Sequence, residues 1–209
     1  MKKLLLTVLI AAMMVLPLGT VAMADDKPLT QSPEANESYT PGEAPAQSDV
    51  SFMIPALHAV LLAMENQDVS SFTTADTVMS WEMLYNLLSM YGQLDDRSDY
   101  DGDMLVLPSE TVMDFSSALF SAPLSPDTLP EELTDRITYC ADSDSYRLFC
   151  GSDDLAEVVI TNTRDLGSAM AVSGKLMFLA ENTELASFSA TLAVSDNLFG
   201  YTLIAMDVI

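Results

Sequence analysis

Residues 186–194 read ASFSATLAV, in which every second residue from Ala186 to Val194 is apolar and the residues between them are small or polar. This alternation decides the class of fold. Successive side chains of a β-strand point to opposite faces, so a two-residue period places one set on each face. Residues 170–178 alternate in the same way, and Asn182-Thr183 marks a turn between the two segments. This pattern predicts an antiparallel hairpin with one buried face.

The two-residue period extends to both sides of this hairpin. It predicts further strands at 137–141, 146–150, 155–160 and 201–208, the first two joined by a tight turn. Gly174, inside a long strand, marks a point where the sheet can bend. We therefore expect a curved antiparallel β-meander of about five to six strands in the C-terminal part.

The preceding part of the chain has a helical period instead. It predicts a helix over 55–66, and a longer one that starts with Thr73 as its cap and stops at Gly92. The longer helix is apolar over most of its circumference, so we expect it to pack on two sides, with Trp81 in the core. After a short strand at 104–107, Ser109 caps a third helix.

The predicted order of elements defines an α+β fold with three N-terminal helices packed on the sheet. Over residues 51–209 this order resembles the nuclear transport factor 2-like (cone) fold, in which helices pack into the concave face of a bent sheet. The resemblance rests on element order alone, and without a shared motif it assigns no functional residue. Members of that fold range from small-molecule enzymes to non-catalytic interaction modules.

The first 24 residues carry the pattern of a secretory signal peptide. Two lysines precede an apolar run over 4–16, and the small-x-small sequence Ala22-Met23-Ala24 follows. The run is too short to span a membrane. We therefore expect cleavage after Ala24 and a secreted protein, either extracellular or periplasmic.

The segment 25–50 is rich in Pro, Ser and Glu and has almost no aliphatic residues. It cannot bury enough apolar area to offset the entropy lost on ordering, so we expect a disordered linker. A single globular domain is predicted to follow over 51–209.

The chain is strongly acidic, with 8 basic and 31 acidic side chains and a formal net charge of −23. Loss of the predicted signal peptide lowers this charge to −25, because two lysines and no acid leave with it. Such a charge keeps a protein soluble and repels nucleic acid. The expected partner is an unidentified protein or a cationic or small-molecule ligand, with no nucleic acid and no membrane span after cleavage.

One acidic loop resembles half of a calcium-binding loop. Asp99, Asp101 and Asp103 alternate around Gly102, and carboxylates with a glycine turn are typical of calcium sites. Against an EF-hand, however, the first ligand position falls on an arginine and the twelfth on a proline. A weak calcium site and a solvated acidic turn both remain open, and no other cofactor is expected.

The two cysteines, Cys140 and Cys150, are candidates for one disulfide, because an exported chain meets an oxidising environment. The hairpin alternation, however, places Cys140 on the face opposite to Cys150, so a bond requires a shifted or bulged register. Two free thiols are the alternative.

No catalytic set is visible in the sequence. His58 is the single histidine and falls at the edge of the first apolar stripe, where it is expected to be a boundary residue. The sequence therefore favours a non-catalytic binding or interaction module of the cell envelope or extracellular space. The alternative is a small cone-fold hydrolase or isomerase that uses carboxylates in a pocket between helices and sheet. Inward-facing acids in such a pocket would favour the enzyme, and an apolar core there would favour the module.

Overall fold

The computed structural model describes residues 49–151 and 155–209, which belong to one compact unit. The predicted signal peptide and residues 25–48 of the predicted linker lie outside the described residues. Of that linker the structure describes Asp49 and Val50, which start the fold. The Asp49 carboxylate accepts a hydrogen bond from the Ser51 amide at 2.9 Å and caps the short helix η1 (Val50–Met53).

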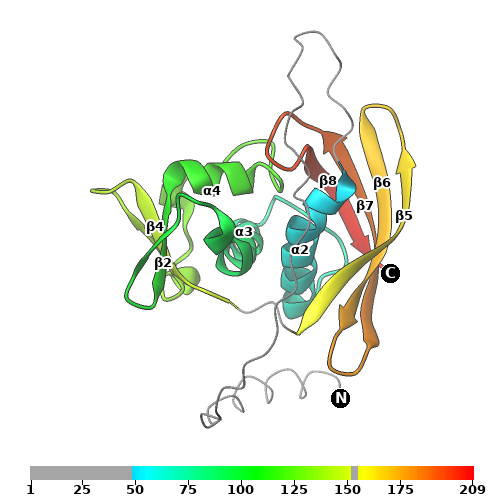
Figure 1. The fold of residues 1–209 in the computed structure, drawn as a ribbon, viewed down its shortest axis with the longest axis horizontal. Helices are drawn as coiled ribbons and strands as arrows, with labels where there is room; N and C mark the ends of the chain where they lie inside the picture. Colours follow the sequence, from blue (N-terminus) through cyan, green and yellow to red (C-terminus); the bar gives the residue numbers. More distant parts are fainter. Residues whose placement is uncertain (1–48, 152–154) are drawn as a thin grey trace, which may run out of the picture. The chain divides into compact units, whose positions relative to one another are not determined.

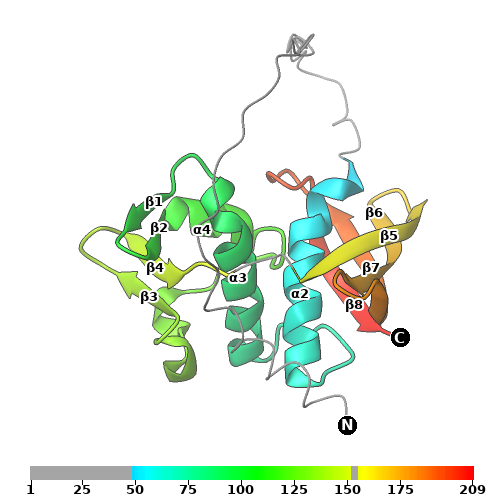
Figure 2. The ribbon, with the colours of Figure 1, turned by 60° about the horizontal axis from the view of Figure 1, so that its bottom comes forward.

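The fold is α+β, with three helices followed by antiparallel strands in two four-stranded sheets. The helices are α2 (Ile54–Gln67), α3 (Thr77–Tyr91) and α4 (Ser109–Ser116), with short 3-10 turns η2 (Gly92–Leu94), η3 (Pro126–Thr128) and η4 (Glu131–Leu133). In both Figure 1 and Figure 2, α2 lies between the larger sheet and α3, and α3 lies between α2 and the smaller sheet.

The larger sheet is the predicted meander, with strand order β5-β6-β7-β8. Its strands are β5 (Ala156–Asp165), β6 (Ala169–Phe178), β7 (Thr183–Val194) and β8 (Tyr201–Val208). The predicted alternation is confirmed, because every second residue of β6 and β7 is buried over most of their length. The buried set faces the helices and includes Val172, Leu176, Phe188 and Leu192.

The predicted single meander of five to six strands is wrong in one respect. The hairpin of β3 (Ile137–Cys140) and β4 (Ser145–Phe149) belongs to a second sheet of order β1-β2-β4-β3, with β1 (Asp99–Asp101) and β2 (Met104–Pro108). The reason is the exposed edge of β2, whose buried side chains continue the apolar face of β4 when the two strands pair. Together these strands cover the side of α3 that the larger sheet does not reach.

Packing on two sides explains the composition of the central helices. Eight residues of α2 are buried, seven of them hydrophobic, as expected for a helix enclosed all round. Trp81 on α3 is fully buried, which confirms the predicted core position. His58 is not a boundary residue: it is 2% exposed, with Nδ1 2.8 Å from the Tyr91 hydroxyl. Enclosure of α2 by its two neighbours buries the edge of its stripe as well.

The start of α3 also differs from the prediction. Asp76, and not Thr73, caps the helix, and its carboxylate accepts hydrogen bonds from the amides of Val78 and Met79 at 2.9 and 3.2 Å. The helix starts later because the preceding residues serve another purpose: the Phe72 amide donates to the Met206 carbonyl at 2.7 Å. That bond covers the free edge of β8.

Gly174 is required by close packing. A Cβ at this position would lie 2.6 Å from the Val159 carbonyl oxygen and 2.7 Å from the Phe188 ring. Opposite this residue, the β5–β6 register shifts between Ile160 and Asn162, which leaves Thr161 as a bulge. No helix among the described residues is long and apolar enough to cross a membrane.

Candidate binding pocket at the start of helix α4

The turn between β3 and β4 is hydrogen-bonded to Ser109, the first residue of α4. Asp144, the last residue of this turn, has a left-handed backbone with φ 44°, a conformation that Asp and Asn adopt more readily than most residues. Its carbonyl accepts a hydrogen bond from the Ser109 amide at 3.0 Å. Because the first amides of a helix lack partners within the helix, this bond supplies a cap to α4 from 35 residues away. Ser109 does not cap its own helix as predicted.

The Asp144 carboxylate lies at the same helix end. Its Oδ1 accepts hydrogen bonds from the Ser109 hydroxyl at 2.6 Å and the Tyr139 hydroxyl at 2.9 Å. These two hydroxyls hold the pKa of Asp144 below its usual value, so the group is ionised at neutral pH. Neither bond involves Oδ2, which therefore keeps its full acceptor capacity.

Tyr146 on β4 is the second polar group at this position. Its ring packs between those of Trp81 and Tyr139, with centroid distances of 6.1 and 5.0 Å. Burial, with a further contribution from Tyr139 and the Asp144 charge, raises the pKa of Tyr146 to about 12. The phenol is therefore protonated at neutral pH and can donate a hydrogen bond.

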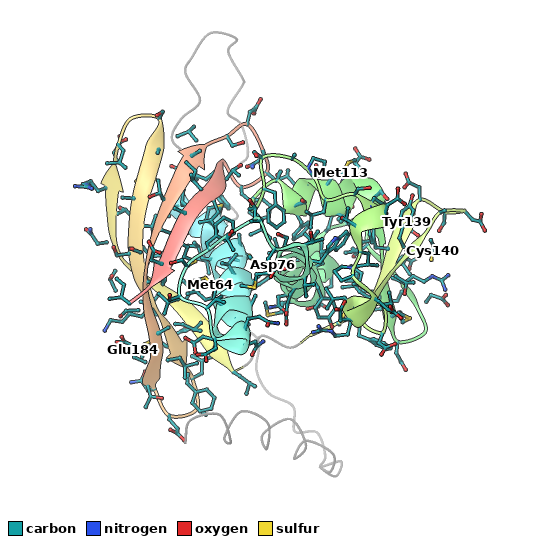
Figure 3. The ribbon with its side chains drawn as sticks, turned by 180° about the vertical axis from the view of Figure 1, so that it is seen from behind. Met64, Asp76, Met113, Tyr139, Cys140 and Glu184 are labelled. Carbon is teal, nitrogen blue, oxygen red and sulfur yellow. The ribbon has the colours of Figure 1, made fainter. Side chains whose placement is uncertain are left out.

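These groups line a cavity of about 380 Å³ between α3, α4, the β3–β4 turn and the loop that follows α4. In Figure 3, Met113, which lines the cavity from α4, lies on the same side of the structure as Tyr139 on β3. Its walls are mostly apolar, and its lining residues are Leu84, Ser109, Val112, Met113, Ser116, Pro123, Leu124, Ser125, Pro126, Asp144 and Tyr146. An apolar cavity of this size with few polar groups is typical of small-molecule sites.

Ser116, the last residue of α4, provides the clearest sign of a ligand site. The residue is 2% exposed, and its Oγ has no hydrogen-bond partner among the described residues. A buried hydroxyl without a partner costs about 1–3 kcal/mol, and most buried polar groups are paired. Thr111 on the same helix has a second buried hydroxyl without a partner among the described residues, but only Ser116 lines the cavity, where a ligand could reach its hydroxyl after a rotation of the side chain.

A larger depression of about 740 Å³ lies between residues 72–74, 117–121 and the β7–β8 turn. Two of its polar side chains, Asn197 and Thr202, are hydrogen-bonded to the protein itself. The Asn197 amide donates to the Ser117 and Tyr201 carbonyls, each at 3.0 Å, and the Thr202 hydroxyl donates to Ser117 as well at 2.7 Å. These bonds hold the turn in place, so this depression is the weaker candidate.

The predicted calcium ligands do not gather around one point. Asp99 and Asp101 lie in β1 and Asp103 in the turn to β2. Asp101 forms an ion pair of 2.9 Å with Arg147. No group of three His, Cys, Asp or Glu residues among those described is arranged to hold a metal ion. Calcium binding by this loop stays a prediction.

The two cysteines are not bonded to each other. Cys140 lies opposite Ser145, at the turn end of the hairpin, and Cys150 follows the other end of β4. Five residues of strand separate the two positions, or about 17 Å, and a disulfide needs Cα atoms within about 7 Å. This register therefore does not allow the disulfide and agrees with the alternative of two free thiols. The Cys150 sulfur lies 3.5 Å from the Tyr100 hydroxyl.

The sequence indicates the local structure around each of these pocket residues, but not that they lie close together in the fold. The sequence predicts Ser109 as a helix cap and a tight turn between the strands 137–141 and 146–150; Asp144 lies in that turn, and Tyr146 begins the second strand. The pairing of β4 with β2 joins them, because it places Ser145 opposite Pro108, next to the start of α4. The one local signal was Ser116, a polar residue beside the apolar stripe of a short helix.

No family model matches the chain, and no curated protein is similar to it in sequence. The pocket is therefore the feature of the molecule that points to a function.

Proposed function

We propose that the protein is an exported, non-catalytic binding module whose pocket beside α4 holds a small organic cation with an apolar body. The observation that carries this proposal is the combination, in one mostly apolar cavity, of an ionised carboxylate and a buried hydroxyl without a partner. A polar group of the ligand would pair with Ser116, and its ammonium group with Asp144.

Charge supports a cationic ligand. No lysine or arginine is among the residues that line the cavity, and Asp144 has a free carboxylate oxygen. Asp127 follows Pro126, a residue of the cavity wall, and adds a second negative charge near it. The net charge of the chain adds a field of the same sign, which attracts cations and repels anions.

The titration behaviour of the pocket favours binding over acid–base catalysis. A general acid or base works best with a pKa near the working pH. Here the pKa of Asp144 is lowered and that of Tyr146 is raised to about 12, so both move away from neutrality. The space between α2 and the larger sheet, where the hydrolase or isomerase alternative expected its carboxylates, is packed with apolar residues such as Phe188, Leu192 and Met206.

Tyramine is a suitable first probe, since it joins an apolar ring to a primary ammonium group and carries one hydroxyl. Calorimetric titration is expected to show tyramine binding and no comparable binding of 4-ethylphenol, which has the same ring and hydroxyl but no amine. Asp144→Asn keeps the backbone conformation and the shape of the side chain but removes the charge. It is therefore expected to weaken tyramine binding by about tenfold or more.

The matched control is Asp196→Asn, which removes one negative charge at the larger depression instead. Its tyramine affinity should equal that of the unmodified protein. Equal binding of the amine and its neutral analogue, or equal losses in the two Asn variants, would remove the basis of the proposal.

A further inference from the structure

The two sheets present four edges, and three of them are short or covered. The β1 and β3 edges are three and four residues long. The β8 edge is covered, because the Phe72 amide donates to the Met206 carbonyl and the Val208 amide donates to the Ser70 carbonyl at 2.8 Å. Natural proteins shorten or cover edge strands in these ways, because an open edge pairs with other chains.

The β5 edge is long, and no described segment covers it. This strand has ten residues, and its central residues 158–163 read VVITNT, with no charge and no proline. Val159 is 39% exposed. No other described segment pairs with the outer side of β5. The edge therefore offers a long row of backbone donors and acceptors to a further strand.

Two ladder bonds show which backbone groups face outward. Leu179 donates to the Leu155 carbonyl and Leu166 donates to the Ala169 carbonyl, both at 2.9 Å. Antiparallel pairs alternate between hydrogen-bonded and non-hydrogen-bonded positions. Counting inward from these bonds along the register, Val158 and Thr163 fall at non-hydrogen-bonded positions. Their amides and carbonyls therefore point away from β6, toward the open side.

Charge on this strand is arranged at its two ends. Glu157 lies near the start and Arg164 near the end, and both are exposed. The other described basic residues, Arg97, Arg136, Arg147 and Lys175, each form an ion pair. Arg164 forms none within the described part of the chain, although the protein carries a large excess of acids.

The bulge places both charges on the same face of the sheet. Glu157 pairs with Met177 and Arg164 with Ala171, two residues of the β6 face that is turned away from the helices. Residues seven apart in a regular strand point to opposite faces. Because Thr161 is an extra residue in the strand, Glu157 and Arg164 point to the same face after all. The Thr161 hydroxyl donates to the Ser173 carbonyl at 3.1 Å.

We propose that β5 pairs antiparallel with β5 of a second copy of the chain, with Glu157 opposite the partner's Arg164. In a two-fold symmetric dimer this ion pair forms twice, once at each end of the paired strands. The same register places Val158 opposite the partner's Thr163, so the outward backbone groups of both residues meet. The occupant is a second copy because the strand is complementary to itself: reversing its direction exchanges the acid with the base.

Sedimentation equilibrium of the purified chain, up to about 500 µM, tests the pairing. The unmodified protein should form a dimer. Glu157→Arg alone, or Arg164→Glu alone, places like charges opposite each other twice and should raise the dissociation constant by about tenfold or more. The double variant, which swaps the two charges, should recover the original constant. Circular dichroism checks that each variant remains folded.

Cysteine cross-linking tests the register itself. In a Cys140→Ser, Cys150→Ser background, Val159→Cys with Asn162→Cys places two cysteines opposite each other across the proposed interface. Mild oxidation should join two chains in this variant and not in the one that carries Val159→Cys alone, whose cysteines lie three residues apart along the paired strands.

A monomer at every concentration would overturn the proposal. A dimer that tolerates both single charge reversals would also overturn it, because the interface would then lie on another surface.

Discussion

Replacement of Ser116 by alanine is expected to make the protein more stable and its pocket less able to bind. Most substitutions in a buried position destabilise. Here the residue is 2% exposed, and its hydroxyl has no partner among the described residues. Its removal therefore relieves a desolvation cost that the folded state now carries, and the ligand loses the hydrogen bond that would have compensated for it.

The size of the effect follows from three contributions. An unpaired buried hydroxyl costs about 1–3 kcal/mol, and alanine is the better helix former by about 0.5 kcal/mol. The lost oxygen leaves little new void, because the side chain already borders the open cavity. The net gain in the free energy of unfolding is about 1.5–3.5 kcal/mol, which raises Tm by about 3–14 °C for a domain of this size.

Thermal unfolding followed by circular dichroism measures the gain, and Ser80→Ala provides the control. Ser80 is also a buried helical serine, at 1% exposed, but its hydroxyl donates to the Asp76 carbonyl at 2.9 Å. Its replacement should leave Tm unchanged or lower it. Tyramine affinity should fall about two- to tenfold in Ser116→Ala only. A lower Tm for Ser116→Ala without ligand would refute the reasoning, because the hydroxyl would then have a partner in the free protein.

Other expected outcomes concern the sheet, the thiols and the pocket charge. Gly174→Ala should cost about 3 kcal/mol or more in unfolding free energy, since the added methyl group meets both a backbone carbonyl and the Phe188 ring. Denaturant unfolding measures this, and a loss below about 1 kcal/mol would contradict it. Thiol titration of denatured, unreduced protein should find Cys140 and Cys150 both reactive, and a result of none would restore the disulfide. Tyramine affinity should be constant from about pH 8 to 5 and fall only below the usual carboxyl range, because the pKa of Asp144 is lowered and the charged form is lost as pH falls through it. A fall already near pH 6 would contradict the role of Asp144.

The elements of this fold follow from local patterns, because a helix or strand with one buried face repeats its apolar residues at a fixed period. The three helices and the strands of the meander were predictable for that reason. The second sheet was not, because its strands are short and its pairing of β2 with β4 joins residues about 40 apart. Alternation in a sequence shows which face of a strand is buried, but not which strand lies beside it.

The pocket was less predictable than the fold for a related reason. A strained turn residue such as Asp144 looks like any acidic turn until the helix that it caps is placed next to it. Ser116 looks like an ordinary polar position near a helix end. Their function depends on distances between segments, and such distances leave no period in the sequence.

The covered edge of β8 has a consequence for the time at which the protein completes its fold. The last strand is held by residues 70–72 and by the Ala118 carbonyl, which accepts from the Leu203 amide at 2.8 Å. Contacts between such distant parts of a chain form slowly, and these wait until β8 has been synthesised. A nascent chain that lacks its last strand leaves the apolar face of the larger sheet incomplete. Such a delay would suit the export that the N-terminal sequence predicts, because a chain that has not yet closed can still be threaded through a narrow channel.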